Sequence, residues 1–426
     1  YPNCTELYLF EDGSVTSLES MYDTNNMNTA RQIENVHFMD GYFKNLTNFN
    51  RTFRHLDYLK RVENLPNSIT SMSYGFEFAG SKSSEGLTLT NLPSNLTSLY
   101  NTFTASALLK CPKIPKSVKN LSCAFSSCKR LNQEFDLSDY NINKDDLSYT
   151  WNQCSSLTYT PILPTNYTGS LASAFQGTKI TTAPVLPDGV TSLVSAFREC
   201  KELTTVSNIP SNCVDYNNAF RGCTKLTSVP ETGWKGNMLW TFSYTLINQK
   251  IVINSASDLS STFAYCGSLN ITPTLPKEMK GSMSNCFKSC PNLVTPPQTP
   301  EGVTDMNCAY QYCSNLEQAP YIPDSVINIS YMICGCSKIT EITIPLDSIL
   351  FNRVENAFQT CTALTRVYWR GIRTTDWNLL GFGKSTYEQE DLKDLVNNHL
   401  EDLYKDKIKI SYGSKITIND TETTIS

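Results

Sequence analysis

Residues 219 to 230 read Ala219-Phe220-Arg221-Gly222-Cys223-Thr224-Lys225-Leu226-Thr227-Ser228-Val229-Pro230, and this pattern returns along the chain. Relative to the aromatic residue, apolar residues stand seven and four places before it, cysteine three places after it, and Leu or Ile six places after it. The stretch from Phe287 through Cys290 to Leu293 repeats the downstream half. A frame that recurs in this way indicates a repeat architecture.

The aromatic anchor defines fourteen units at intervals of 21 to 27 residues. The anchors are Phe53, Phe76, Phe103, Phe125, Trp151, Phe175, Phe197, Phe220, Phe242, Phe263, Phe287, Tyr310 and Phe358, with Ile333 in the remaining slot. A unit of about 23 residues is too short to bury its own apolar side chains, so each coil must stack on its neighbours. The predicted fold is therefore a repeat solenoid of leucine-rich-repeat-like coils, made mainly of short parallel strands and turns.

Each coil offers one segment that suits a strand. It follows the anchor as Leu-x-x-(Val/Ala)-(Pro/x), as in Leu226 to Pro230, and proline at its end fits because proline cannot donate to a ladder. The Val/Leu-Thr-x-Leu/Met stretch before the next anchor is expected to turn the chain back along the opposite face. We call the stretch after the anchor the downstream segment and the stretch before the next anchor the upstream segment. We predict one strand per coil, in the downstream segment.

The repeat pattern stops after Leu364. We therefore predict a solenoid domain over residues 1–370 and a small α+β C-terminal cap over residues 371–426. The cap is predicted to contain an amphipathic helix from Tyr387 to Tyr404 and a hairpin with arms at 408–410 and 416–418. At the other end, Tyr1 to Leu7 already lies in register with the repeat, so we expect further protein to precede it.

These repeats resemble the BspA-like leucine-rich-repeat family. The matching residues are 219–230 and Cys313-Ser-Asn-Leu316-Glu-Gln-Ala319-Pro320-Tyr-Ile322-Pro323-Asp-Ser-Val326, and the likeness covers roughly Tyr1 to Arg370. The resemblance implies a solenoid that adheres to cells, matrix or other proteins. It implies a place on bacterial surfaces, or in virion and tail proteins of phages that infect gut bacteria. The units at Phe76, Trp151 and Phe242 depart from the frame.

Charge and hydropathy exclude two classes of partner. The net charge is −5 and no block of Lys or Arg occurs, so the chain lacks the basic surface that nucleic acid or an anionic membrane would need. No apolar run approaches the eighteen or so residues of a membrane span, so direct membrane insertion is not expected.

Sixteen cysteines invite a metal or disulfide interpretation. Nine of them share the position three residues after the anchor: Cys128, Cys154, Cys200, Cys223, Cys266, Cys290, Cys313, Cys336 and Cys361. A small, weakly polar residue suits the inside of a coil, so we predict buried, reduced thiols. Zinc would require clustered ligands with short paired spacings, which the sequence does not offer.

No motif supports catalysis or a cofactor. His37, His55 and His399 are isolated, and neither HExxH nor GxSxG occurs, so we expect no enzyme. Gly381 to Ser385 imitates the end of a phosphate-binding loop but lacks its first glycine, and Ser385 better fits a helix N-cap. Asp139 to Asp145 resembles half a calcium loop but lacks its glycine and glutamate, so a lengthened repeat turn is favoured. We predict no cofactor and no metal.

Because no motif supports catalysis, we expect the function to be binding. The favoured hypothesis is a phage virion protein of a tail, baseplate or head appendage that recognises a host surface or another virion subunit, because many free thiols suit assembly in a reducing cytosol. The alternative is a bacterial or protist cell-surface adhesin. A weaker third possibility is an enzyme that uses the repeats as a targeting arm. The expected partner is a protein or a cell-surface glycan, and the expected location is the virion or the cell surface.

The contact surface is predicted on the strand face, where residues between the fixed Leu and Val/Ala positions point outward. That ladder contains Tyr159, Thr181, Thr204, Ser228, Val294, Glu317, Gln318, Arg366 and Tyr368. Aromatic and arginine side chains are the usual anchors of interfaces. We therefore select Tyr159, Glu317, Gln318, Arg366, Tyr368, Trp369 and Arg370. The alternative for the cluster 366–370 is that it packs against the capping helix.

Overall fold

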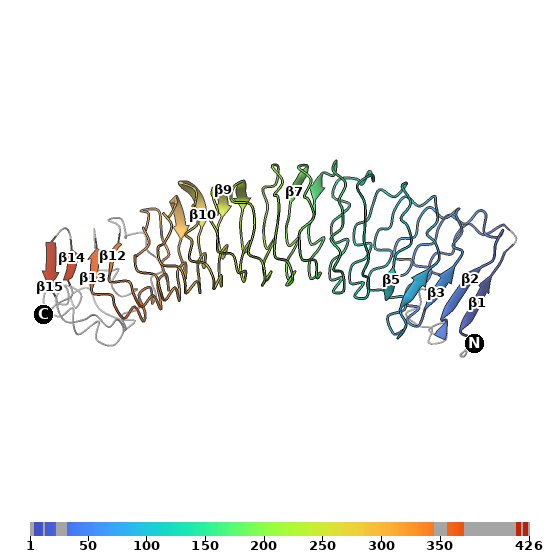
Figure 1. Ribbon diagram of the computed structural model, residues 1–426, viewed down its shortest axis with the longest axis horizontal. Helices are drawn as coiled ribbons and strands as arrows, with labels where there is room; N and C mark the ends of the chain where they lie inside the picture. Colours follow the sequence, from blue (N-terminus) through green and yellow to red (C-terminus); the bar gives the residue numbers. More distant parts are fainter. Residues whose placement is uncertain are drawn as a thin grey trace. The chain divides into compact units, whose positions relative to one another are not determined.

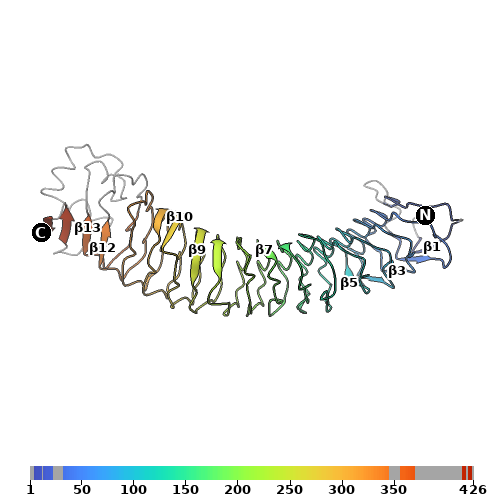
Figure 2. The ribbon, with the colours of Figure 1, turned by 90° about the horizontal axis from the view of Figure 1, so that it is seen from above.

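The computed structural model describes residues 4–11, 13–22, 32–344, 356–369, 415–418 and 421–424. The chain divides into two compact units, Tyr1–Cys213 and Val214–Ser426, and each is treated by itself. Each unit is a stack of coils whose strands pair in parallel with those of the next coil, as Figures 1 and 2 show. The predicted solenoid is therefore confirmed. Over the described ranges we find no α-helix, and hence none that is long and apolar enough to span a membrane.

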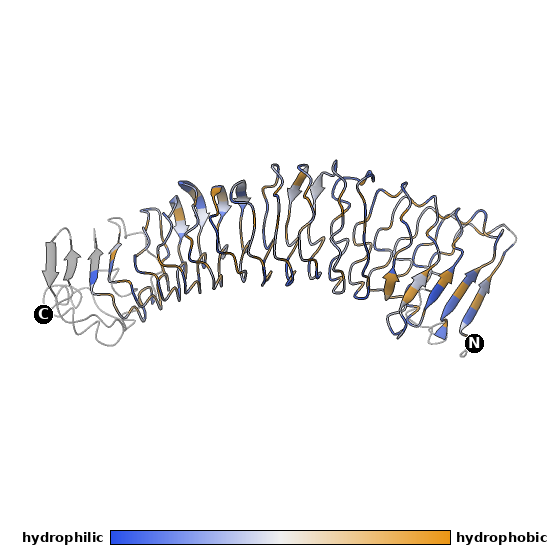
Figure 3. Cartoon of the chain, viewed as in Figure 1, coloured by the Kyte–Doolittle hydropathy of each residue, from blue (hydrophilic) through white to orange (hydrophobic). Residues whose placement is uncertain are grey.

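The first unit contains two parallel sheets. β1 (Glu6–Leu9), β2 (Asn35–Phe38), β3 (Arg61–Glu63), β4 (Leu87–Leu89) and β5 (Leu108–Lys110) pair in chain order, and β6 (Gly169–Ser170) pairs with β7 (Val190–Ser192). Inward and outward residues alternate, since Val36 and Phe38 are buried while Asn35 and His37 are only half-buried. Figure 3 shows this alternation as hydrophobic and hydrophilic bands along the first strands.

The second unit contains three sheets. β8 (Trp234–Asn237) pairs with β9 (Ile253–Asp258), and β10 (Glu278–Ser282) pairs with β11 (Glu301–Asp305). A four-stranded sheet follows the order β12 (Glu341–Ile344), β13 (Arg366–Trp369), β14 (Lys415–Ile418) and β15 (Thr421–Thr424). Its first three strands are parallel, and β14 and β15 are antiparallel.

One arm of the predicted hairpin is described. Residues 416–418 lie in β14, which pairs with β13 on one side and with β15 on the other. Two residues, Asn419 and Asp420, separate β14 from β15, which is the commonest hairpin loop length. The arm 408–410 and the helix predicted from Tyr387 to Tyr404 lie outside the described residues. The division at residue 370 stays a prediction.

The predicted strand position was right in some coils and wrong in others. β1 to β5, β12 and β13 lie in downstream segments, whereas β6 to β11 lie in upstream segments. Proline accounts for the difference in only some coils, since Ser207 follows Val206 in a coil that also lacks a downstream strand. In several coils proline follows the Val/Ala position directly, as in Ala183-Pro184, Val229-Pro230 and Ala319-Pro320, and removes the next ladder donor. Such segments keep at most isolated bridges, such as Thr182 with Thr205.

The core of each unit is a ladder of aromatic anchors. Successive rings stack with centroids 5.2 to 5.9 Å apart, and most anchors are completely buried. Between Phe125 and Trp151, where the unit is longer, Phe135 inserts its ring at 5.2 and 5.4 Å from the two anchors. The longer repeat therefore keeps the ladder filled.

The cysteine three places after the anchor also has a structural role. Its thiol donates to the backbone carbonyl of the anchor one coil earlier, as Cys200 Sγ does to Phe175 O at 2.9 Å and Cys290 Sγ does to Phe263 O at 3.0 Å. The same bond forms at Cys128, Cys154, Cys266, Cys313, Cys336 and Cys361. These thiols are buried, as predicted. Burial raises the pKa of the Cys200 thiol to about 11, so the protonated donor form is the stable one.

Candidate binding surface

The outward side of β1 to β4 carries long charged and aromatic side chains in register. Glu6, Asn35 and Arg61 occupy equivalent places on β1, β2 and β3, and Thr88 of β4 continues that row. A second row contains Tyr8, His37 and Glu63. We call these seven residues the N-terminal strand face. Parallel pairing brings them within contact distance because neighbouring strands lie about 4.8 Å apart.

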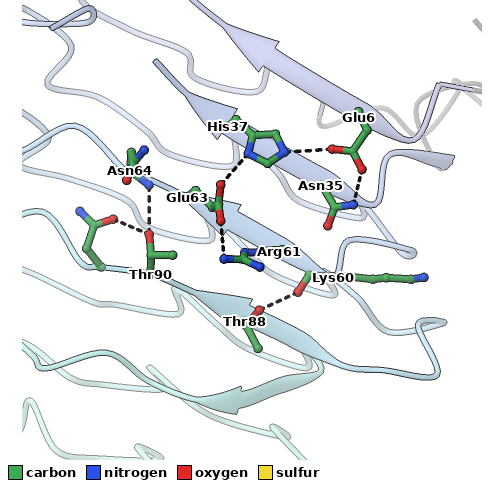
Figure 4. A network of polar contacts seen from close by, with 10 residues as sticks. Glu6, Asn35, His37, Lys60, Arg61, Glu63, Asn64, Thr88 and Thr90 are labelled. Carbon is green, nitrogen blue, oxygen red and sulfur yellow. Dashed lines mark hydrogen bonds and ion pairs between the residues drawn. The ribbon is translucent and has the colours of Figure 1, made fainter. Parts of the chain in front are cut away.

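His37 is the centre of this face, as Figure 4 shows. Its Nδ1 lies 2.6 Å from Glu63 Oε2 and its Nε2 lies 2.9 Å from Glu6 Oε2. Ionised carboxylates only accept hydrogen bonds, so the ring bonds both of them at once only in its protonated form, in which both nitrogens donate. The hydrogen bond to Glu6, assisted by Glu63, raises the pKa of His37. Reciprocally, the His37 and Asn35 hydrogen bonds lower the pKa of Glu6.

Further pairs extend the network along the sheet. Arg61 bonds Glu63 at 2.5 Å, and Lys60 bridges Glu34 at 3.0 Å and Glu85 at 2.8 Å. These groups remain in contact with water, so each pair adds little stability. Their effect is to hold the side chains in one arrangement. The ring of Tyr8 stacks on His37 at 4.6 Å and is 55% exposed, which leaves an aromatic surface beside the charges.

A hollow of about 510 Å³ borders this face, which lies in the size range of small-ligand sites. It is lined by the loop Met39–Lys44 after β2, by Asn64–Ser68 after β3, and by Thr90 and Asn91 after β4. The ring of Phe10 lies 6.3 Å from that of Tyr42, and both side chains are exposed. The hollow therefore combines aromatic, amide, hydroxyl and charged groups.

Most of the predicted ladder is exposed as expected. Tyr159 in the first unit is 46% exposed, and Glu317 and Gln318 in the second unit are exposed as well. Both second-unit residues line a hollow of about 600 Å³ with Tyr321, Asp324 and residues 340–343. Thr181, Ser228 and Val294 also face solvent, while Thr204 is half-buried. Tyr159 belongs to the first unit, and Glu317 and Gln318 belong to the second, so the two parts are described separately.

The predicted cluster at 366–370 falls on β13 and the residue after it. Arg366 forms an ion pair with Glu341 of β12 at 3.3 Å. In register, Arg366 and Tyr368 pair with the exposed Glu341 and Thr343, and Trp369 pairs with the buried Ile344. Arg370 lies outside the described residues. The choice between a contact surface and packing under the predicted helix therefore stays a prediction.

The other sequence candidates have structural explanations. Asp145 of the imitation calcium loop accepts the N–H of Ser170 at 2.6 Å, and Tyr140 of the same stretch is buried and donates to the carbonyl of Ile114. These contacts fit the lengthened repeat turn. Within the described part of the chain, no three His, Cys, Asp or Glu side chains gather as a metal site. The stretch from Gly381 to Ser385 and His399 lie outside the described residues.

The sequence matches the family model described as BspA type leucine rich repeat region (6 copies), over residues 27–146, 76–203, 147–236 and 240–365. These matches cover well over half of the chain. The chain belongs to the BspA-type leucine-rich-repeat family. The resemblance seen in the sequence is thus confirmed, and the protein is a leucine-rich-repeat protein of a family of binding solenoids.

Solved structures of similar fold come from bacteria. A leucine-rich repeat protein of Bacteroides ovatus matches with a TM-score of 0.59 and 18% identity, over 83% of this chain and 91% of that chain. A leucine rich cell surface protein of Faecalibacterium prausnitzii matches with a TM-score of 0.45 and 19% identity, over 90% and 92% of the two chains. At this identity the first likeness shows a shared leucine-rich-repeat fold alone. No curated protein matches the sequence.

Sequence reasoning missed the N-terminal strand face, although its signal is present. Val62 occupies the same frame position as Val229, so Arg61 and Glu63 beside it are outward by the same alternation. The BspA-type frame is harder to read there because Leu56, Ala79 and Ser106 replace the cysteine. The outward residues of these coils were therefore not included in the predicted ladder.

Proposed function

We propose that this BspA-type chain is a non-catalytic binding protein of a bacterial cell surface, which holds a protein or a glycan on the outward side of its coils. The observation that supports this most is the N-terminal strand face. It offers aromatic, arginine and carboxylate side chains that are ordered by the fold without being needed in the core.

The cell-surface location rests on the family. Its resemblance implies adhesive solenoids on bacterial surfaces, whereas neither the family match nor the structural neighbours point to a virion. The virion hypothesis relied on free thiols. Buried thiols with raised pKa values resist oxidation in any compartment, so they do not favour a cytosolic assembly.

The proposed contact surface has one part in each unit. In the first unit it is the N-terminal strand face together with Tyr159. In the second unit it is Glu317 and Gln318 with the β13 cluster Arg366, Tyr368, Trp369 and Arg370. Tyr, Trp and Arg are enriched among residues that dominate binding energy.

The test compares two double variants of the full chain in binding to bacterial cells, host epithelial cells and extracellular matrix. Tyr8→Ala with Arg61→Ala removes the first part, and Arg366→Ala with Tyr368→Ala removes the second. Tyr149→Gly is the matched control, because Tyr149 is 45% exposed and lies beside the anchor Trp151, away from the downstream segment, and its φ of 59° is one that glycine adopts without strain.

We expect at least one double variant to bind roughly tenfold more weakly at unchanged melting temperature, and the control to bind normally. Retained binding by both double variants would remove the strand face from the proposal. Absence of wild-type binding to all three surfaces would contradict the adhesive function. A lowered melting temperature of the second variant, with normal binding per folded molecule, would assign Arg366 and Tyr368 to packing.

A further inference from the structure

The hollow beside β2 to β4 has walls that the fold fixes without a ligand. Phe43 N donates to Glu11 Oε1 at 2.6 Å, and Ser68 Oγ donates to Phe43 O at 2.8 Å, which anchors the loop after β2. The Asn91 amide bonds both backbone groups of Leu65, at 3.0 and 2.8 Å, which anchors the loop after β3. A pre-formed site avoids the entropy cost of ordering loops on binding.

The polar side chains inside this hollow differ from those on the neighbouring face in whether they are already bonded within the protein. On the N-terminal strand face, His37, Glu6, Glu63 and Arg61 already bond to one another. Around the hollow, no hydrogen bond or ion pair within the described ranges engages the side chains of three exposed residues, Asp40, Lys44 and Asn64. These groups supply a carboxylate, an ammonium and an amide that are available to a ligand.

The apolar groups of the hollow lie at one rim. Met39 and Tyr42 are 43% and 48% exposed, and the exposed ring of Phe10 approaches Tyr42. Exposed aromatic rings beside available hydrogen-bonding groups suit a ligand that has an apolar side and many hydroxyls. The rings cover the C–H side of a sugar, while amide and carboxylate groups bond its hydroxyls.

Charge and backbone arrangement narrow the choice of ligand. Asp40 and Lys44 offset each other, so the lining favours neither a polyanion nor a polycation. A peptide strand would require an open row of backbone donors and acceptors, but β2, β3 and β4 are each paired on both sides. A neutral sugar chain carries no charge and does not need an open row of backbone donors and acceptors, so it fits this lining.

We propose that this hollow binds a neutral oligosaccharide, with Tyr42 as the stacking surface and Asp40 and Asn64 as hydrogen-bonding groups to sugar hydroxyls. The inference rests on the proposed binding function and specifies the ligand class for one part of the surface. Its volume of about 510 Å³ accommodates a few sugar units of a longer chain rather than a whole polymer.

The test is affinity electrophoresis of the full chain in gels that contain mannan, β-glucan, xylan or galactan, with heparin as the charged comparison. The variants are Tyr42→Ala and Asn64→Gly. Glycine is chosen because Asn64 has a φ of 57°, in the left-handed region where alanine would add strain. Tyr149→Gly is again the control, because it removes an equally exposed ring outside the hollow at a residue whose φ of 59° also favours glycine.

We expect at least one neutral polysaccharide to retard the wild type and the control equally, with an affinity roughly tenfold or more lower in each of the two variants. The same polysaccharide should slow amide exchange in residues 39–44 and 64–68, a readout that needs no variant. The proposal is overturned if only heparin retards the protein, if no neutral polysaccharide does, or if Tyr42→Ala binds as the wild type does. Cell or matrix binding that persists without any retardation in neutral gels would remove this inference and leave the proposed function intact.

Discussion

The coils of β2 to β4 and the coils at Ala183-Pro184 and Val229-Pro230 have the same frame but present different surfaces. In the first set, proline is absent from the place after the Val/Ala position, and the downstream segment forms a regular strand. In the second set, proline occupies that place and the segment forms no strand. The outward residues also differ, because the first set includes the long side chains of His37, Arg61 and Glu63, whereas those of the second set are mostly Thr or Ser.

This difference separates what the core requires from what the surface requires. Both sets stack aromatic anchors at nearly the same spacing, 5.4 Å for Phe76 with Phe103 and 5.2 Å for Phe175 with Phe197. The core therefore tolerates either kind of downstream segment. Long outward side chains occur where regular strands hold them in register, and this favours the N-terminal coils as the place of recognition.

The largest expected effect concerns the shared core. Phe76→Ala and Phe263→Ala each remove a completely buried ring from the middle of a stack. Because both the transfer free energy and the cavity contribute, each should lower the free energy of unfolding by about 3–5 kcal/mol. Urea denaturation of the two variants checks this. A loss below about 1 kcal/mol in only one of them would mean that the two sets of coils do not share one kind of core.

The next effect tests the role of proline. Glu63 occupies the frame position that Pro184 and Pro230 hold in other coils. Glu63→Pro should lower the free energy of unfolding by about 1–3 kcal/mol, because β3 has a parallel partner on each side and proline cannot donate to the ladder.

Two variants serve as controls for Glu63→Pro. Glu63→Ala removes the same side chain and keeps the N–H. Ser207→Pro places proline at the equivalent position of a coil whose downstream segment forms no strand, and it should change stability by less than about 0.5 kcal/mol. Equal losses for Glu63→Pro and Ser207→Pro, measured by urea denaturation, would show that proline does not decide where the strands form.

How far the sequence predicted this molecule depended on which residues repeat. The anchor, the cysteine and the leucine recur together, because each coil must complete the same core, and the solenoid followed from them. Strand position depended on local features that do not recur in every coil, such as the proline after Ala183 or Val229. The N-terminal strand face required knowing that Glu6, His37 and Glu63 meet across three strands, and such contacts between coils are not visible in spacing alone.

A smaller effect tests the hydrogen bond made by the thiol of the repeat cysteine. Thr178 and Thr245 already occupy the cysteine position in two coils, where each hydroxyl bonds its own anchor carbonyl at 2.8 and 2.7 Å. Cys200→Thr should therefore fold and lower the free energy of unfolding by about 1 kcal/mol, the usual value of one hydrogen bond. In the wild type, a thiol reagent should modify the nine repeat cysteines only after denaturation. Rapid modification of the native protein at these positions, found by mass spectrometry, would contradict their place in the core.

The smallest expected effect is the pH dependence of the N-terminal strand face. The folded state raises the pKa of His37 above its ordinary 6.5, so the stabilisation is fully present below that pH and is lost as pH rises through the raised value. The pKa of Glu6 is lowered from 4.5, so its contribution is present above 4.5 and is lost as pH falls through the lowered value. The stability advantage of the wild type over His37→Gln should therefore be greatest between these two pH values.

This advantage should stay below about 1 kcal/mol, because the Glu6 carboxylate is half exposed and water screens the pair. Amide exchange of β1 to β3, measured from pH 4 to pH 9, resolves such a local change better than global melting does. His55→Gln is the control, because His55 stacks on the ring of Phe78 and lies outside the strand face. An advantage of His37 that stayed constant from pH 5 to pH 9 would mean that the ring is neutral and bonds only one carboxylate. Strand pairing alone would then keep the charged side chains of the N-terminal coils beside one another.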